Sequence, residues 1–302
     1  MNAPATPDRT QTAADRMDLL VSKIDELNTP GCVGIDPVFE NIPSALHDSD
    51  ETRTIEQFSL EALDAVAGVV PAVKPQSACF ERYGSAGYAV LERVISKARD
   101  LGLVVILDAK RGDIGSSAKH YAKGAADMGA HFITVSPYMG PSTIEPFLDA
   151  GLGVFALART SNPDSDEVQR LPLADGRPLV HAIGSMISDM GQSHYGSSGL
   201  SGLGAVVGAT KGGDEMGAIR ECMPNQMFLV PGIGAQGGSI EDVRPMCRPE
   251  SSCEGQAGAG QLGVVVNASR SVLYPVGHGD SWQDRVHQAA VGLAESLRTL
   301  VR

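Results

Sequence analysis

Charged residues stand at the ends of three short apolar segments, and they are the first candidates for chemistry. Asp36 ends CVGID, Lys74 ends VVPAVK and Asp108 ends LVVILD. Lys110 and Asp113 follow Asp108 within the run DAKRGD. Carboxylates on either side of an ammonium group hold it charged, so that it can supply an electric field and then a proton to a bound substrate. The pattern predicts a reaction centre around Asp108, Lys110 and Asp113.

The run DAKRGD has a second interpretation, a set of solvated loop charges in a surface salt-bridge array. Burying alternating acids and bases costs desolvation energy that folding alone does not require, and this cost favours a functional role. Lys110 lies two residues after Asp108, so strand alternation predicts that both side chains point to the same side.

A glycine-rich segment and a later arginine form a candidate phosphate site. Residues 231–239 read PGIGAQGGS, with Gln236 among the glycines. Glycines let backbone amides approach an anion closely, and a following helix N-terminus adds a favourable dipole. Arg270 follows an apolar segment in NASRS, where a guanidinium can bind phosphate oxygens through two hydrogen bonds. A plain turn is the other interpretation of the glycines, and the arginine favours the phosphate site.

The elements that must position these residues alternate between short apolar strands and amphipathic helices, which is typical of a parallel sheet. The expected strands are Cys32–Asp36, Val69–Lys74, Leu103–Asp108, Phe132–Val135, Val154–Leu157, Gly204–Val207, Phe228–Val230 and Val264–Asn267. The expected helices include Thr54–Ala67, Gly87–Leu101, Ser116–Met128 and Ile144–Ala150. This order predicts a closed (β/α)₈ barrel of the α/β class, the TIM barrel, in which charges at several strand ends converge on one mouth. A doubly wound open sheet is the alternative.

The barrel is expected to occupy residues 16–302 as a single catalytic domain with insertions after strands 5 and 7. The first, Asn162–Leu203, is far longer than an ordinary connection, resembles an insertion over one mouth and contains a predicted helix near Leu179–Met190. The second, Cys247–Gly263, is rich in Gly and Ser and is predicted to be a flexible loop. Residues 1–15 are predicted to form a disordered tail because they carry few large apolar side chains. The sequence leaves open which segment, if either, closes over a ligand.

Composition excludes several classes of protein. The net charge of −12 disfavours nucleic-acid and anionic-membrane partners. No apolar run approaches the ~20 residues of a membrane span, and the N-terminus lacks the apolar core of a signal peptide, so a cytoplasmic location is expected. The cysteines are odd in number and widely spaced, which argues against a disulfide framework and a zinc site: Cys32, Cys79, Cys222, Cys247 and Cys253. The histidines without H-x-x-x-H spacing are interpreted as structural or surface residues: His120, His131, His181, His194 and His278.

Taken together, these segments resemble those of the orotidine 5′-phosphate decarboxylase family. DAKRGDIGSS is similar to the family signature Asp-x-Lys-Arg-x-Asp-Ile, CVGIDP to its first-strand motif, VKPQ to its second-strand lysine, and PGIGAQGG with the later arginine to its phosphate loops. The resemblance extends from Cys32 to Ser271, and TSNPDS with the segment after it resembles the longer bacterial subgroup. Ser117 stands where the family commonly has threonine, so it receives no role.

The resemblance implies the decarboxylation of orotidine 5′-phosphate to uridine 5′-phosphate in de novo pyrimidine biosynthesis, without a metal ion or cofactor. It also implies that Lys110 protonates C6 of the pyrimidine and that Asp113 reaches the active site of the other subunit in a homodimer. The remaining implied roles are a charged network of Lys74, Asp108, Lys110 and Asp113, ribose binding by Asp36, contact with the pyrimidine edge by Ser161, and phosphate binding by Gln236 and Arg270.

Two other functions are compatible with a barrel of this kind. The first is a metal-dependent sugar-phosphate decarboxylase or epimerase, and the decarboxylases among these relatives carry an acidic metal ligand at the second strand end. Lys74 stands at that position, and a cation there disfavours Mg²⁺. The second is a catalytically silent protein that binds nucleotide phosphates, which would bind uridine 5′-phosphate and leave orotidine 5′-phosphate unchanged. The complete set of charges favours an enzyme.

Overall fold

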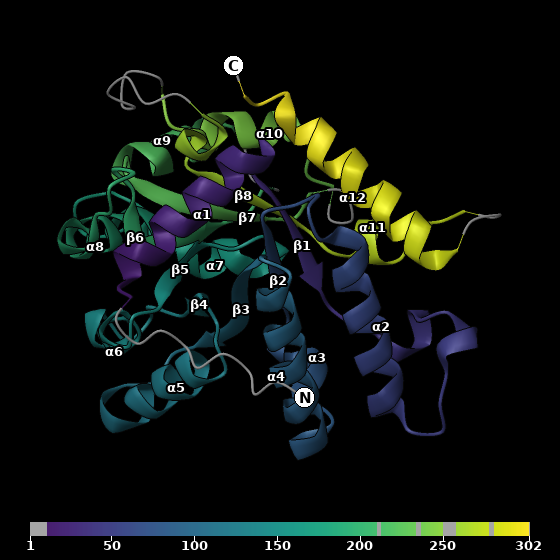
Figure 1. Cartoon of the computed structure of the whole chain (residues 1–302). Coiled ribbons are helices and arrows are strands. Elements are labelled where there is room, and N and C mark those ends of the chain that lie inside the picture. The colour runs from purple at the N-terminus through teal and green to yellow at the C-terminus, as the bar shows by residue number, and fades with distance from the viewer. Residues whose placement is uncertain (1–10, 210–212, 234–236, 250–257, 278–280, 302) are drawn as a thin grey trace.

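The computed structural model describes residues 11–209, 213–233, 237–249, 258–277 and 281–301 (Figure 1). Parallel strands form a closed barrel in sequence order, and β8 pairs with β1 to close it. The strands are β1 (Gly31–Ile35), β2 (Ala72–Pro75), β3 (Val104–Arg111), β4 (Phe132–Val135), β5 (Gly153–Arg159), β6 (Ser201–Val207), β7 (Gln226–Pro231) and β8 (Val264–Ala268). The predicted TIM barrel is confirmed, and the closed strand order excludes the open sheet.

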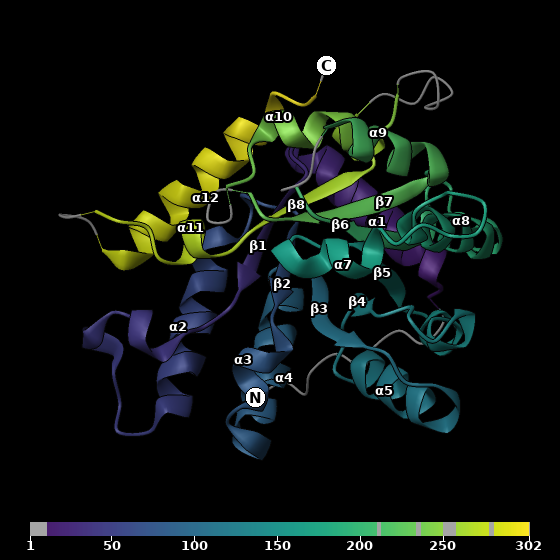
Figure 2. The same ribbon diagram turned by 180° about the vertical axis from the view of Figure 1, so that it is seen from behind.

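Helices surround the barrel, as the two opposite views show (Figures 1 and 2). They are α1 (Ala13–Leu27), α2 (Glu51–Val66), α3 (Ser77–Glu81), α4 (Gly84–Asp100), α5 (Gly115–Asp127), α6 (Glu145–Asp149), α7 (Asp166–Gln169), α8 (Leu179–Gly191), α9 (Gly213–Cys222), α10 (Ile240–Val243), α11 (Arg270–Leu273) and α12 (Trp282–Arg298). The longer ones bury one apolar stripe each; in α2, for example, Ile55, Phe58 and Leu63 are fully buried. Such stripes at helical spacing explain why the sequence pattern located these helices.

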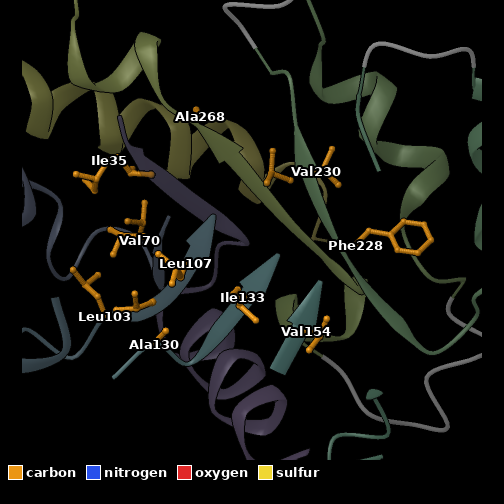
Figure 3. Close-up of a cluster of buried hydrophobic side chains, with 14 of the residues drawn as sticks. Ile35, Val70, Leu103, Leu107, Ala130, Ile133, Val154, Phe228, Val230 and Ala268 are labelled. Atoms are coloured by element: carbon orange, nitrogen blue, oxygen red, sulfur yellow. The ribbon is translucent and has the colours of Figure 1, made fainter. Parts of the chain in front are cut away.

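Alternation along the strands divides the buried side chains into two layers. In β3, Val105 and Leu107 belong to the layer between strands and helices, part of which Figure 3 shows, and Val104 and Ile106 belong to the barrel interior. Successive side chains of a strand point to opposite faces, so each strand supplies both layers. The interior layer also contains Cys32, Ala72, Phe132, Phe155, Met227 and Val265. The barrel is therefore a packed core over most of its length, and open space is found at one end.

Helix α1 covers the N-terminal end of the barrel. Its Met17, Leu20 and Ile24 are fully buried in the interior layer, next to residues at the beginnings of the strands. Thr12 caps this helix by accepting a hydrogen bond from the Asp15 amide, and the Asp15 carboxylate accepts one from the Thr12 amide. Residues 13–15 are therefore helical, and the predicted tail of residues 1–15 is too long at that end. Residues 1–10 lie outside the described residues.

Both long connections contact helix α1 at the N-terminal end of the barrel, and in the first the amides of Ser197 and Ser198 donate to the Asp18 carboxylate of α1. In the first, α7 follows the end of β5, and α8 packs against β5 and β6 in the outer ring. The helix predicted near Leu179–Met190 is confirmed as α8. In the second, the described residues Ala259–Leu262 form a 3-10 turn against α1, and the Gly260 amide donates to Asp25 Oδ1 at 2.8 Å. That turn lies at the N-terminal end, far from the strand ends that carry the charges.

Candidate active site

The C-terminal ends of the strands surround a cavity of about 610 Å³. Predicted site residues line it: Asp36, Lys74, Asp108, Lys110, Ser161 and Arg270. The remaining walls are formed by Val38, Gln76, Thr134, Leu157, Thr160, Asn162, Val206, Leu229, Pro231, Gly232, Ile233, Asn267 and Ser269. One mouth of the barrel thus brings together charges from the ends of β1, β2, β3 and β8, which are far apart in the sequence.

Asp108 is the centre of the charged part of the cavity. Its Oδ2 accepts hydrogen bonds from Lys74 Nζ at 2.6 Å and from Gln76 Nε2 at 3.1 Å. Its Oδ1 accepts hydrogen bonds from Lys110 Nζ at 2.6 Å and from Thr134 Oγ1 at 2.9 Å. A carboxylate offers about four lone-pair positions. The protein therefore occupies the accepting capacity of Asp108 before any substrate binds.

Burial and charge act in opposite directions on this cluster. Burial alone would raise the pKa of the Asp108 carboxyl, but Lys74 and Lys110 outweigh burial and hold that pKa well below its usual range. Burial alone would lower the pKa of Lys74, but the carboxylates of Asp108 and Asp36 raise it above its usual value. Both shifts favour the charged forms. Lys74 and Asp108 therefore form an ion pair throughout the neutral pH range, although each is at most 6% exposed.

Lys110 reaches Asp108 through an irregular backbone. β3 continues past Asp108, and its register against β4 shifts between Leu107 and Arg111. Lys110 has a φ of 45°, in the left-handed region, which costs roughly 1–2 kcal/mol for a residue with a Cβ atom. Its amide donates to Thr134 Oγ1 at 2.9 Å. The two side chains meet as alternation predicts, but a distorted strand end, and not regular alternation, brings them together.

The β1 and β8 side of the cavity has buried acceptors that the described protein leaves unpaired. Asp36 Oδ1 and Asn267 Oδ1 are buried and have no hydrogen-bond partner among the described residues. Asn267 Nδ2 donates weakly to Ser269 Oγ at 3.3 Å. An unpaired buried acceptor costs free energy unless a ligand or water donates to it. These two oxygens are therefore suited to accept hydrogen bonds from ligand hydroxyls.

Ser161 lines the cavity two residues after a buried arginine. Arg159, at the end of β5, is fully buried and donates to Asp166 of α7 at 2.5 Å and to Glu215 of α9 at 2.8 Å. A buried guanidinium requires such paired acceptors. These ion pairs fix the end of β5 to α7 and α9. The segment that begins at Thr160, including Ser161, therefore follows a rigid anchor.

Arg270 lines the same cavity from the first turn of α11, which follows β8, the strand paired with β7. Pro231, Gly232 and Ile233 line the cavity at the end of β7, and Gly232 has a φ of 104°, a conformation that favours glycine. The chain therefore turns sharply at the predicted phosphate loop. Gln236 lies outside the described residues, so its predicted contact stays a prediction.

Asp113 does not line the cavity of its own chain. Its Oδ1 accepts a hydrogen bond from the Ile114 amide at 2.8 Å, just before α5. Ile114, Tyr138 and Met139 are exposed apolar residues in the connections that follow the paired strands β3 and β4. The structure thus separates Asp113 from the other predicted catalytic residues and places it next to the exposed Ile114.

Three lining residues that the sequence analysis did not select are Gln76, Thr134 and Asn267. Each stands at or beside the end of a strand, in VKPQ, ITVS and VVVNA. The rule that selected the charged residues, a polar side chain at the C-terminal end of an apolar segment, would have selected these as well. Their side chains are neutral, so charge at the strand ends does not reveal them.

The residues interpreted as structural occupy ordinary positions where they are described. His131 is buried at the beginning of β4, and its Nδ1 accepts a hydrogen bond from the Val105 amide at 2.9 Å. Among the described residues, no group of three or more His, Cys, Asp or Glu side chains is arranged to hold a metal ion. In the same part of the chain, no helix is both long and apolar enough to cross a bilayer. His278 and Cys253 lie outside the described residues.

Comparison with known proteins gives consistent matches over most of the chain. Residues 32–270 match the family described as orotidine 5′-phosphate decarboxylase / HUMPS family. The orotidine 5′-phosphate decarboxylase of Rhodopirellula baltica is 38% identical over 294 residues, which cover 88% of this chain and 93% of that protein. The enzyme of the same description from Nocardioides sp. is 42% identical over 252 residues, covering 81% and 86%. The solved OMP decarboxylase of Leishmania donovani is similar with a TM-score of 0.73 and 28% identity, covering 94% of this chain and 98% of that one.

Proposed function

Since the chain belongs to the orotidine 5′-phosphate decarboxylase / HUMPS family and catalyses the decarboxylation of orotidine 5′-phosphate in pyrimidine biosynthesis, we propose that Lys74, Asp108 and Lys110 carry out this reaction without a metal ion or cofactor. The observation that carries the proposal is the position of the Lys110 ammonium group. It lies 2.6 Å from Asp108, and its side chain is 47% exposed at the cavity.

The chemistry requires a fixed field. When the bond between C6 and the carboxylate breaks, CO₂ leaves and the electron pair stays on C6, where no adjacent group can delocalise it. Preorganised charge can stabilise such a carbanion because the protein does not have to reorganise during the step. The Lys110 ammonium group supplies this positive charge and then transfers a proton to C6 to give uridine 5′-phosphate.

Asp108 acts in this proposal as a permanent anion and not as a base. Its four hydrogen-bond donors leave it no free lone pair to take up a proton, and they hold Lys110 in one orientation. Repulsion between Asp108 and the substrate carboxylate would add a smaller effect, which disappears as CO₂ leaves.

The other half of the cavity binds the part of the substrate that does not react. Asp36 Oδ1, a buried acceptor, is positioned to bind a ribose hydroxyl, and Arg270 to bind the phosphate, together with Gln236. Ser161 contacts the edge of the pyrimidine. Binding energy from these remote groups holds C6 against Lys110, so that weakening them lowers the rate as well as the affinity.

Lys110→Ala tests the central assignment. We expect the variant to fold and to lose turnover by at least about 10³-fold, because it lacks both the field and the proton donor. The assay is the loss of orotidine 5′-phosphate absorbance, with unfolding midpoints measured in parallel. Lys123→Ala, which removes an exposed lysine paired with Asp127 on α5, is the matched control and should keep full activity. Near-normal turnover by Lys110→Ala would remove the assignment.

The same assay with excess chelator distinguishes the metal-free reaction from a metal-dependent one. We expect unchanged turnover, because Lys74 occupies the second-strand position and the oxygens of Asp108 are already bound by protein donors. Loss of activity that a divalent cation restores would favour the metal-dependent alternative. Binding of uridine 5′-phosphate without any consumption of orotidine 5′-phosphate would favour the silent binding protein.

We also propose a cytoplasmic homodimer in which Asp113 completes the active site of the partner subunit. Asp113 lies outside the cavity of its own chain. The exposed Ile114 after β3, and Tyr138 and Met139 after the paired strand β4, provide apolar surface for an interface. Cys32, Cys79 and Cys222 are free thiols, as is usual for a reducing compartment.

Mixing inactive subunits tests the shared site. Lys110→Ala and Asp113→Ala homodimers should each be nearly inactive. In a random mixture, half of the dimers are hybrids, and one of the two sites in each hybrid is intact, so about a quarter of the wild-type activity should return. Hybrid formation is verified by native mass spectrometry with one subunit tagged. Verified hybrids without recovered activity would contradict the shared site.

A further inference from the structure

Thr134, at the end of β4, makes two hydrogen bonds that connect the charged cluster to the backbone. Its hydroxyl donates to Asp108 Oδ1 at 2.9 Å and accepts from the Lys110 amide at 2.9 Å. The residue is 1% exposed and lines the cavity. A hydroxyl is the smallest side-chain group that can donate and accept at the same time. This position therefore uses both functions of one oxygen, on two neighbouring residues.

The acceptor function of the Thr134 hydroxyl affects the backbone of Lys110. With a φ of 45°, this residue is in a conformation that a side chain with a Cβ atom rarely adopts and that persists only where surrounding contacts enforce it. The register shift at the end of β3 removes regular pairing with β4 there. The amide instead binds the Thr134 side chain, so the hydroxyl replaces a missing interaction of the sheet.

The donor function of the Thr134 hydroxyl affects the ammonium group of Lys110. Lys110 Nζ and Thr134 Oγ1 share the same oxygen of Asp108 as their acceptor. The oxygen is therefore fixed by a rigid β-branched side chain, while the lysine that it holds is long and flexible. Thr134 thus contacts the backbone of Lys110 directly and its ammonium group through Asp108.

We propose that Thr134 is a positioning residue for decarboxylation: its hydroxyl holds the left-handed backbone of Lys110 and the Asp108 oxygen that orients the Lys110 ammonium group. The inference rests on the proposed role of Lys110 as proton donor. According to this inference, the neutral Thr134 side chain on the neighbouring strand increases the rate of the chemical step and does not affect substrate affinity.

Thr134→Val, which keeps the shape and removes the hydroxyl, is the direct test. We expect kcat to fall by about 10- to 100-fold, the usual effect of removing a hydrogen bond to a charged group that acts in the transition state. The dissociation constant of uridine 5′-phosphate, measured by calorimetry, should change by less than about threefold, since no phosphate or ribose contact is touched. A kcat within twofold of wild type would overturn the inference, as would a loss confined to KM.

A second pair of variants isolates the hydroxyl if valine disturbs folding. Thr134→Ser and Thr134→Ala both lack the methyl group and differ from each other only in the oxygen. The serine variant should stay within about fivefold of wild-type kcat, and the alanine variant should be at least about tenfold slower than serine. Equal rates for the two would show that Thr134 acts through packing alone, and would overturn the inference.

Thr143→Val is the matched control. Thr143 is also fully buried, but its hydroxyl donates to the backbone oxygen of Gly140 at 2.8 Å, away from the cavity. Its loss should lower stability and leave kcat unchanged. Lys110→Ala in the same assay separates the two hypotheses. An active Lys110→Ala variant would remove the proposed proton donor, whereas an inactive one beside a fully active Thr134→Val would remove only the role of Thr134.

Discussion

The two halves of the cavity differ in whether their buried polar atoms have hydrogen-bond partners in the protein. In the half formed by β2, β3 and β4, Asp108 is bound by four donors from the protein itself. In the half formed by β1 and β8, Asp36 Oδ1 and Asn267 Oδ1 are buried without a partner among the described residues. A reacting group must be in place before the reaction, because reorganisation would add to the barrier. A binding group gains most when its partner arrives with the ligand. The first half is thus assembled by folding, and the second is completed by the substrate.

Asp108→Asn should break the first half and have the largest effect. Losing one buried charge leaves Lys74 as an unpaired buried cation, so we expect a loss of about 3–5 kcal/mol in the free energy of unfolding. Because the asparagine amide also faces donors, kcat should fall by at least about 10³-fold even in folded protein. Urea unfolding and steady-state kinetics measure the two losses. A variant as stable as the wild type would show that the charged half is not assembled by folding.

Asp36→Ala should affect the second half in a different way. The change removes a buried oxygen that the described protein does not bind, which favours the folded state, and a charge that stabilises the Lys74 cation, which opposes it. The free energy of unfolding should therefore change by less than about 1 kcal/mol. kcat/KM should fall by about 10- to 100-fold, because a ribose hydroxyl loses its acceptor. Loss of stability equal to that of Asp108→Asn would erase the difference between the halves. Asp64→Ala, at an exposed salt bridge with Lys97, serves as the control for removing an aspartate.

A smaller effect should come from the opposite end of the barrel. Burial, with smaller contributions from Arg16 and Arg99, lowers the pKa of His131 to about 3. Between that value and about 6.5, the unfolded chain binds a proton that the folded chain does not, so acidification favours unfolding. The Asp108 contribution is present above its unfolded pKa, near 4, and is lost only as the pH falls below that value. Stability lost between pH 6 and 4.5 should therefore come from His131, at about 1–2 kcal/mol.

His131→Asn tests this assignment because an asparagine oxygen can accept the hydrogen bond from the Val105 amide without titrating. The free energy of unfolding of this variant should vary less between pH 6 and 4.5 than that of the wild type. Chemical denaturation at several pH values measures it. An unchanged slope would assign the acid sensitivity of the fold to other groups, including those of the active site.

The fold was accessible from the sequence because the buried strands are short apolar runs that end next to a polar residue or a glycine. The observed range of β4 coincides with its predicted range. Asp108 belongs to β3 and lines the cavity, as its position at the end of an apolar run predicts. The backbone of Lys110 was not accessible, because a positive φ at a lysine depends on contacts from β4 that no local pattern encodes. Thr134 stands at the end of a strand, where a search for neutral polar groups would find it, but its role could not be read from that position. Its importance lies in two partners that are 24 and 26 residues away in the sequence.

Helix α1 was only partly predictable. A local signal, Thr12 followed by Asp15, marks its beginning, and the composition of residues 1–15 outweighed that signal. Its function as the cover of the barrel depends on Met17, Leu20 and Ile24 meeting residues from several strands. Such tertiary contacts have no counterpart in a local pattern.

The shared acceptor at Asp108 also constrains how this barrel could evolve toward other chemistry. A single substitution of Lys74 by an acid would bring a second carboxylate next to Asp108 and leave Lys110 as the only cation bound to it. The mutant would meet two repelling charges in a buried site before a divalent cation could compensate for them. A change from the proposed metal-free reaction to a metal-dependent one would therefore pass through a less stable protein, and it would require coupled substitutions around the two oxygens of Asp108.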